Sequence, residues 1–287
     1  MPGNVYLYKI SFLSNTKNER MRKWWYGALL SVVLMCDGAT AFADNTVTVV
    51  IDKTSTEYIA SVYKKIGFCR DGKLDPLVFE SAYKGYLQLK NAGKLDKEII
   101  SICDFSLSAN VNRLWIIDLK ENKVLYNTYV AHGQGSGEEF ATSFSNRENS
   151  HQSSLGFYVT GDTYLGEHGI SLRLHGMDNR YNDAALDRGI VLHGANYVCD
   201  DFIRGNKRLG RSWGCPAVGA GLAPEIIDLV KGGSCLFIYY PDKKYLASSY
   251  WLNKKKLPLP DQAADQQFQL KTPAQPDGED KPQVLVN

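Results

Sequence analysis

This chain of 287 residues lacks the features that mark several large classes of protein. Beyond residue 43 it has no apolar segment long enough to span a bilayer, which takes about 20 residues. It has no internal repeats and no basic stripe, because residues 44–287 hold 28 basic and 29 acidic side chains. Nothing therefore indicates binding to a phosphate backbone. Its 44% hydrophobic and 22% charged residues are typical of a globular chain with a packed core.

The basic residues gather near the start of the chain. Residues 22–23 are Arg-Lys, an apolar run covers 24–35, and residues 41–43 are Ala-Phe-Ala. This order is typical of a secretory signal peptide with its cleavage site. We therefore expect a signal peptide over 21–43, an upstream extension over 1–20, and export to the periplasm or cell envelope. The alternative is a membrane anchor that is not removed.

Cysteine is scarce, and its number is informative. One of the six cysteines falls in the expected signal peptide, and the others are Cys69, Cys103, Cys199, Cys215 and Cys235. An odd number in an exported chain leaves one thiol free, paired with another chain, or reactive. An oxidising compartment favours disulfides among the rest. If Cys215 is free, the other four allow three pairings, and the sequence does not choose between them.

The first part of the exported chain has helical patterns. Apolar residues recur at helical spacing over 57–66 and 76–91. Asp75 and Pro76 supply an N-cap and a proline at the first helical position, and Gly93 ends the second run. We expect a small helical region over 44–104 whose role is packing.

From about residue 104 the chain becomes rich in β-formers. A helix beginning at Pro224 interrupts the pattern and ends at Gly232-Gly233. Expected strands cover 113–118, 124–130, 155–160, 171–175, 189–193 and 235–240. Short strands with Gly-rich turns predict a mainly β sandwich or barrel over 105–248, and an α+β chain overall. The polar segment 249–287 is expected to be a disordered tail.

A loop around Cys215 is the sharpest chemical feature. The segment 211–217 reads Arg-Ser-Trp-Gly-Cys-Pro-Ala, which is too rich in turn formers for the interior of a strand or helix. Such a loop can turn its N–H groups inward to hold a developing oxyanion, each donor contributing about 3–4 kcal/mol. Pro216 has no N–H, so the expected donors are those of Gly214 and Cys215.

The thiol needs a base, because at its reference pKa only about 3% is thiolate at neutral pH. The candidates are His132, His151, His168, His175 and His193. His193 ends the apolar run 189–193, so a strand would deliver it to a loop, where catalytic groups are often held. The plainer alternative is a buried cysteine and a core histidine with no role in catalysis.

Residues 106–240 resemble the catalytic domain of L,D-transpeptidases of the YkuD type. The family signature is His-Gly or His-Ser followed, after a gap, by Ser or Thr, any residue, Gly and Cys. Here it reads His193-Gly194 and Ser212-Trp213-Gly214-Cys215. The chain is most similar to the murein L,D-transpeptidase catalytic domain subfamily. The further shared stretches are 131–133, 144–146, 153–158, 171–176, 190–195 and 210–217.

The resemblance implies a mostly β fold with a catalytic cleft and no metal or cofactor. Cys215 would attack the carbonyl after the L-centre of diaminopimelate in a peptidoglycan stem, forming a thioester and releasing D-alanine. His193 would take the thiol proton and return it to the leaving amine, while N–H groups of the 212–215 loop hold the oxyanion. An amine of a neighbouring stem or of a wall-anchored protein would then accept the acyl group. Carbapenems are expected to acylate the same cysteine.

The chain departs from the family at several positions. Many members have His or Arg where Trp213 stands, and Arg or Asn where Ala217 stands, so substrate contacts there differ. Gly194 replaces a serine of some members, so a backbone carbonyl is expected to orient His193. His175 would line the cleft or pack in the core, and Arg173 would meet a substrate carboxylate or lie on a solvated strand face.

Three other functions remain open from the sequence. A zinc hydrolase is the first, although no pair of histidines has HExxH spacing. The second is a wall-binding module with an inactive site. The third keeps the chemistry and uses water as acceptor, which makes an L,D-carboxypeptidase or hydrolase.

Overall fold

The computed structural model describes residues 53–68, 72–167 and 169–260. The expected upstream extension and signal peptide, Cys69, His168 and residues 261–287 lie outside these ranges. Five α-helices occur in the described part: α1 Lys53–Ile66, α2 Pro76–Asn91, α3 Asp200–Asn206, α4 Ala223–Val230 and α5 Lys243–Ser248. No helix in these ranges is long and apolar enough to cross a bilayer.

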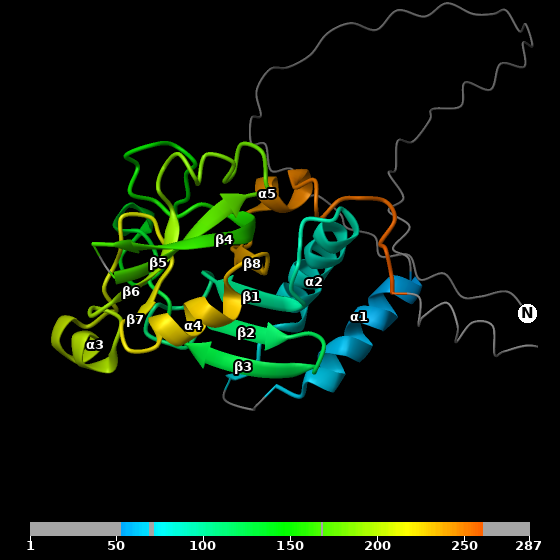
Figure 1. The fold of residues 1–287 in the computed structure, drawn as a ribbon, viewed down its shortest axis with the longest axis horizontal. Helices are drawn as coiled ribbons and strands as arrows, with labels where there is room; N and C mark the ends of the chain where they lie inside the picture. The colour runs from blue at the N-terminus through cyan, green and yellow to red at the C-terminus, as the bar shows by residue number, and fades with distance from the viewer. Residues whose placement is uncertain (1–52, 69–71, 168, 261–287) are drawn as a thin grey trace, which may run out of the picture. The chain divides into compact units, whose positions relative to one another are not determined.

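One mixed, barrel-like sheet of eight strands forms the centre of the described chain (Figure 1). The strands are β1 Ile99–Asp104, β2 Leu114–Asp118, β3 Lys123–Thr128, β4 Gly156–Gly166, β5 Gly169–Gly176, β6 Val191–Ala195, β7 Ala217–Gly219 and β8 Cys235–Tyr239. Their spatial order is β3-β2-β1-β8-β4-β5-β6-β7. The pairs β1–β8 and β6–β7 are parallel and the other pairs are antiparallel. The α+β class with a barrel-like sheet is thereby confirmed.

The two edges of the sheet are joined by the chain that follows β3. Ala131 forms a bridge with Ala217 of β7, and Gly133 forms one with Ser212. Strand β3 and strand β7 are the two edge strands, so these bridges nearly close the sheet. They also lay the 131–133 segment directly against the loop that holds Cys215.

Local signals explain the helices. Asp75 caps α2, since its carboxylate accepts a hydrogen bond from the N–H of Leu77 at 2.7 Å and Pro76 opens the first turn. The expected inner face of α4 is confirmed, because Ile226, Ile227 and Val230 are buried. Helix α2 packs on β1 and β8, and α4 packs on β5 and β6.

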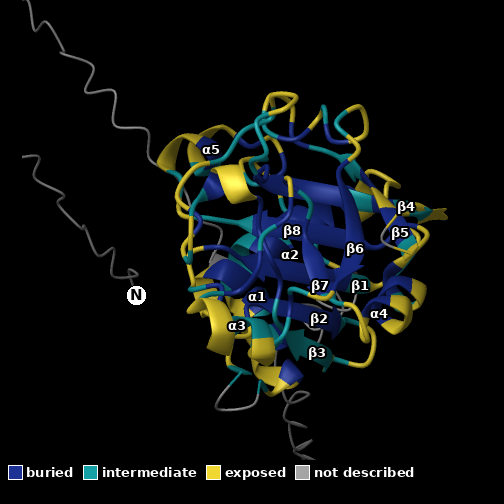
Figure 2. Cartoon of the chain, turned by 90° about the vertical axis from the view of Figure 1, so that its left-hand side faces the viewer, coloured by how far each residue is buried: buried dark blue, intermediate teal, exposed yellow. Residues whose placement is uncertain are grey.

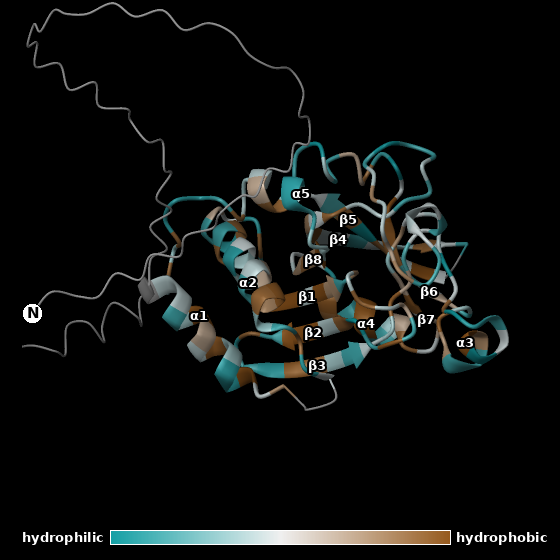
Figure 3. Ribbon diagram, turned by 180° about the vertical axis from the view of Figure 1, so that it is seen from behind, coloured by the Kyte–Doolittle hydropathy of each residue, from teal (hydrophilic) through white to brown (hydrophobic). Residues whose placement is uncertain are grey.

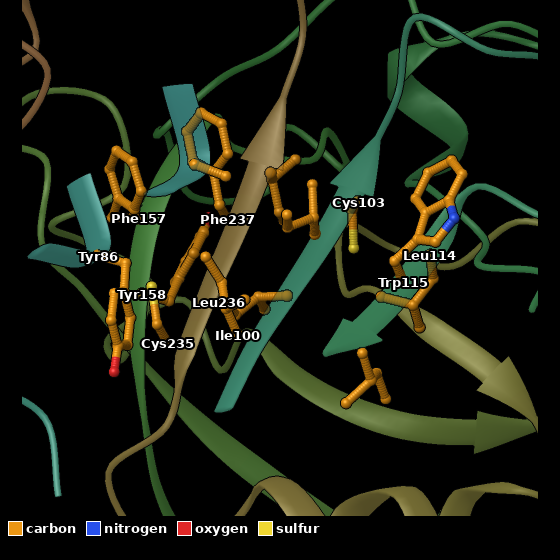
Figure 4. Packing of buried hydrophobic residues seen from close by; sticks show 14 of the residues in the cluster. Tyr86, Ile100, Cys103, Leu114, Trp115, Phe157, Tyr158, Cys235, Leu236 and Phe237 are labelled. Carbon is orange, nitrogen blue, oxygen red and sulfur yellow. The ribbon is translucent and has the colours of Figure 1, made fainter. Parts of the chain in front are cut away.

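The core lies where α2 covers the middle of the sheet. Figure 2 shows the central strands almost wholly buried, and Figure 3 shows β1 and β2 as strongly hydrophobic. Phe157 of β4 stacks on Phe237 of β8 with ring centroids 4.2 Å apart (Figure 4). Gly85 of α2 leaves space for this stack, because a Cβ there would come 2.0 Å from the Phe157 ring. The helix therefore approaches the sheet closely at this point.

Two expected boundaries are wrong. Strand β1 falls within the range 44–104 that was expected to be helical, and it is paired on both sides, with β2 and β8. Its residues are buried on both faces, so it has no alternating pattern that marks a strand in the sequence. The expected tail also begins too early: Trp251 is buried, and its indole N–H donates to the carbonyl of Met177 at 2.7 Å.

The expected disulfides are absent from the described residues, where Cys103, Cys199, Cys215 and Cys235 are free thiols. Cys103 and Cys235 lie on neighbouring strands, but Cys103 pairs with Ile238 and Cys235 with Ile100. The offset of three residues separates their Cα atoms by about 10 Å along the strands. A disulfide requires Cα atoms closer than about 7 Å, so these two cannot be bridged.

Candidate active site

The site is built where β6 runs beside the loop that leads into β7. His193 of β6 pairs in register with Ala217, two residues after Cys215. The N–H of His193 donates to the carbonyl of Pro216 at 3.4 Å. The sulfur of Cys215 accepts from the N–H of Val191 at 3.4 Å. The fold therefore brings the chain around His193 and the chain around Cys215 together, although 21 residues separate the two in sequence.

The imidazole of His193 is held by a backbone carbonyl. Its side chain is buried, and Nδ1 lies 3.0 Å from the carbonyl oxygen of Gly194. A carbonyl only accepts, so Nδ1 carries the proton in the neutral ring and the lone pair lies on Nε2. This is the tautomer that a general base needs, and the contact is the backbone orientation expected from Gly194.

The Gly214 backbone has a conformation that only glycine adopts easily. Its φ is +126°, and a Cβ there would lie 2.9 Å from the carbonyl oxygen of Gln152. The hydroxyl of Ser153 donates to the Gly214 carbonyl at 3.0 Å and accepts from the N–H of Gly133 at 3.0 Å. Neighbouring segments therefore fix the bend before Cys215.

Ser212 braces the same bend from within. Its hydroxyl donates to the carbonyl of Cys215 at 2.6 Å and accepts from the N–H of Gly214 at 3.1 Å. An oxyanion would have to compete with this hydroxyl for the Gly214 N–H, so the expectation of a ready donor at Gly214 needs correction. The Cys215 N–H forms no hydrogen bond within the described residues and remains the better candidate donor.

The thiol of Cys215 is half-buried, and burial raises its pKa. The Val191 hydrogen bond and the positive charge of Arg188 act in the opposite direction but are smaller. The resting side chain is therefore mainly a thiol at neutral pH. Such a site needs a base to form the nucleophile.

Trp213 does not close over Cys215. Its side chain is 71% exposed, and its indole stacks on the ring of His151 with centroids 4.8 Å apart and 7° between the planes. His151 is held in a left-handed conformation, with φ 53°. The two rings form an aromatic pair next to the Cys215 loop, in which Trp213 is exposed and His151 is half-buried.

The structure places His175 and Arg173 on β5, next to β6. His175 is half-buried opposite Val159, and Gly161 leaves space for its imidazole. Arg173 is exposed, with its guanidinium carbon 4.6 Å from the centre of the Tyr164 ring. This cation–π contact matches the alternative of a solvated strand face for Arg173.

His132 is unsuited to act as the base. Arg113 is fully buried, and its Nη2 lies 2.7 Å from Nδ1 of His132. Burial, together with the charge of Arg113, lowers the pKa of His132 to about 4. The His132 carbonyl accepts from the N–H of Ser212 at 3.0 Å, so the Arg113–His132 pair helps to position the loop that holds Cys215. The sequence signal was weak, since Arg113 precedes an apolar strand and resembles a surface residue.

No metal site accompanies these groups in the described ranges, where no three His, Cys, Asp or Glu side chains are grouped as ligands.

The sequence reasoning also missed Arg188. This residue follows the exposed Asp187 and precedes β6, and nothing in its spacing distinguishes it from a surface arginine.

Comparison with known proteins gives the family. Residues 70–239 match the family described as L,D-transpeptidase catalytic domain. This match covers more than half of the 287 residues, so the chain belongs to that family. A search of curated protein sequences found no match.

Solved structures of L,D-transpeptidases are also similar to the chain. An L,D-transpeptidase from Mycobacterium smegmatis is 12% identical, covers 50% of this chain and 59% of its own, and has a TM-score of 0.32. LD transpeptidase LdtMt1 in complex with imipenem is 12% identical, with coverages of 50% and 59% and a TM-score of 0.31. The helical cell shape determining protein Pgp2 from Campylobacter jejuni is 14% identical, with coverages of 56% and 57% and a TM-score of 0.33.

The chain thus spans little more than half the length of these proteins. At such identities and TM-scores the family assignment comes from the 70–239 match alone.

Proposed function

We propose that this protein is an exported peptidoglycan L,D-transpeptidase with Cys215 as nucleophile and His193 as general base. The observation that carries the proposal is the seating of the Cys215 sulfur on the N–H of Val191, two residues before His193 on the same strand. Membership of the L,D-transpeptidase family supports the substrate class, a peptidoglycan stem peptide.

The first half-reaction breaks one amide bond. Nε2 of His193 takes the thiol proton as the sulfur of Cys215 attacks the carbonyl carbon of diaminopimelate. The N–H of Cys215 donates to the oxyanion that forms. The C–N bond then breaks, His193 returns the proton to the leaving D-alanine nitrogen, and a thioester remains.

The second half-reaction regenerates the thiol. An amine of a neighbouring stem, or of a protein to be attached to the wall, attacks the thioester carbon. His193 takes a proton from this amine and returns one to the sulfur, so no co-reactant is consumed. Water in place of the amine gives the alternative product of an L,D-carboxypeptidase.

Purified peptidoglycan provides the test. The full chain is incubated with it, and the fragments released by a muramidase are identified by mass spectrometry. Dimers linked between two diaminopimelate residues indicate a transpeptidase, and tripeptides without dimers indicate a carboxypeptidase. Loss of activity to a chelator, with activity spared by a thiol alkylator, would instead support a zinc hydrolase.

Two alanine variants sharpen this test. Cys215→Ala is expected to abolish both products and the mass increase caused by imipenem while the fold is kept. Cys199→Ala is the matched control, because Cys199 is a half-buried free thiol at the N-cap of α3. Full activity of Cys215→Ala would refute the assignment, and an inactive wild-type chain that imipenem does not label would indicate a wall-binding module.

A further inference from the structure

The Arg188 side chain forms hydrogen bonds with the 145–154 loop, which lies beside the loop that holds Cys215. It is half-buried and lies in the segment that leads into β6. Its guanidinium donates to two carbonyl oxygens, those of Ser145 and Gln152, each at 2.8 Å. It also donates to the hydroxyls of Ser150 and Ser154. All four acceptors belong to the segment 145–154, which contains no helix or strand.

The segment that Arg188 holds is the one that supports the bend before Cys215. Ser153 lies within it and donates to the Gly214 carbonyl. A Cβ placed on Gly214 would lie 2.9 Å from the Gln152 carbonyl oxygen and 3.4 Å from Nη2 of Arg188. The guanidinium, the loop and the Gly214 backbone are therefore packed against each other with no space for a side chain.

The charge of Arg188 is not neutralised by an acid. Within the described ranges Arg188 forms no ion pair with a carboxylate. Its four acceptors are neutral, so its positive charge remains available to a thiolate. Within the described residues, the charged or titratable groups that act on the sulfur are Arg188 and Tyr197, and His193 lies two residues after Val191, whose N–H the sulfur accepts from.

We propose that Arg188 is a positioning residue for the chemistry at Cys215: one guanidinium fixes the 145–154 loop under the Gly214 bend and places a positive charge beside the sulfur when it becomes a thiolate. The inference rests on the proposed role of Cys215 as nucleophile. Arginine suits both tasks, because its planar fork binds several acceptors at fixed angles and it stays charged. Lysine keeps only the charge.

Two variants separate these tasks. Arg188→Gln removes the charge, and Arg188→Lys keeps the charge while losing the fork. Arg204→Gln is the control for charge loss in general, because Arg204 pairs with Asp201 on the exposed surface of α3. The rate of iodoacetamide labelling at the Cys215 peptide is measured against pH by mass spectrometry, and imipenem acylation is measured in parallel.

The expected results differ for the three variants. In Arg188→Gln the midpoint of the labelling profile rises by about 1–3 pH units, the usual effect of losing a nearby opposite charge. In Arg188→Lys the midpoint shifts less, while acylation slows by roughly 10–100-fold because the bend is displaced. Arg204→Gln leaves both unchanged.

The opposite results are equally clear. If both Arg188 variants keep the wild-type midpoint and acylation rate, with only a lower melting temperature, Arg188 is merely structural and the inference is wrong. Arg188→Lys keeps the test decisive if Arg188→Gln does not fold. The labelling profile reports the protonation of the Cys215 thiol directly. If the midpoint shifts in Arg188→Gln but the wild-type protein does not change peptidoglycan, the proposed function is rejected and the effect of Arg188 on Cys215 is upheld.

Discussion

The two parts of the sheet use cysteine in opposite ways. In the covered part, Cys103 of β1 and Cys235 of β8 are buried among apolar side chains (Figure 4). Their exposed fractions are 1% and 0%. In the open part, Cys215 stands in the loop before β7, half-buried between a glycine and a proline. The cysteine side chain packs in the core in one part and is the candidate nucleophile in the other.

The difference lies in access and partners more than in the resting pKa. Burial raises the pKa of Cys103 to about 12 and that of Cys235 above its usual range. Burial raises the pKa of Cys215 as well, but there a backbone N–H opposes it together with the charge of Arg188, whereas at Cys103 only the charge of Arg113 opposes it. A half-buried sulfur that accepts from a backbone N–H, beside a strand that carries a histidine, can be activated, and a sulfur fully buried in the core cannot.

Selective alkylation tests this comparison with the largest expected effect. At pH 8 a thiol with a pKa about 12 is roughly 10⁻⁴ thiolate. We expect iodoacetamide to modify the Cys215 peptide at least ~10³-fold faster than the Cys103 and Cys235 peptides, as read by mass spectrometry. The control is the protein in urea, where the three rates should converge. If iodoacetamide modified all three cysteines of the native protein at similar rates, the two parts would not differ in the reactivity of their thiols.

Removing the base is expected to have the next largest effect. His193→Ala should slow acylation of Cys215 by imipenem about 10²–10⁴-fold, the usual loss for a general base. The measurement is the rate of the mass increase at a fixed pH. His175→Ala is made in parallel. An unchanged rate in His193→Ala with a slowed rate in His175→Ala would move the role of base to β5.

A polar substitution in the covered part should affect stability instead of chemistry. Cys235→Ser places a hydroxyl among apolar neighbours and should lower the free energy of unfolding by about 1–3 kcal/mol, measured in urea. Cys199→Ser is the matched control and should not lower it, because Cys199 is the N-cap of α3 and serine is favoured at that position. Equal effects would show that the core tolerates a hydroxyl at Cys235.

The smallest effect concerns a buried acid next to the covered part. The carboxylate of Asp178 accepts hydrogen bonds from the Phe157 N–H at 2.8 Å and from the hydroxyls of Tyr245 and Ser249 at 3.2 and 2.6 Å. Burial nevertheless raises its pKa. An acid with a raised folded-state pKa stabilises the fold below the unfolded-state pKa, and this contribution is lost as pH rises.

Asp178→Asn removes that pH dependence. The free energy of unfolding of the wild-type protein should fall relative to the variant between pH 4 and neutral pH, as measured by urea unfolding. The control is Asp228→Asn, since Lys231 lowers the pKa of Asp228 and its contribution is lost as pH falls. A difference between wild type and Asp178→Asn that is the same at every pH would contradict the expected sign.

Much of the local structure was predictable from the sequence. The limits of α2 followed from Asp75, Pro76 and helical spacing, and α4 from its proline and its apolar face. Strand β1 was missed because a strand buried on both faces carries no alternation, and β7 because it has three residues. The assignment of Cys215 and His193 came from the Gly-Cys-Pro loop and the family signature, and it remains a proposal.

The surroundings of the site were not predictable in the same way. Arg188 and the 145–154 loop meet over a gap of more than thirty residues, and no pattern in the sequence pairs them. Arg113, whose guanidinium lies against His132, also falls outside any sequence motif. Contacts of this kind depend on which strands pair, and residue spacing alone does not encode that.

The sequence by itself determined the chemistry available to this protein: a cysteine in a glycine bend, a histidine at the end of an apolar run, and membership of a family. Each of these signals spans only a few residues, so it can be recognised in the sequence without knowledge of the tertiary structure. Only the tertiary structure decided which thiols are enclosed, which carbonyl orients His193, and which cation lies beside Cys215. Those outcomes follow from the pairing of β6 with β7 and from the bridges that nearly close the sheet, because long-range backbone hydrogen bonds bring distant residues together.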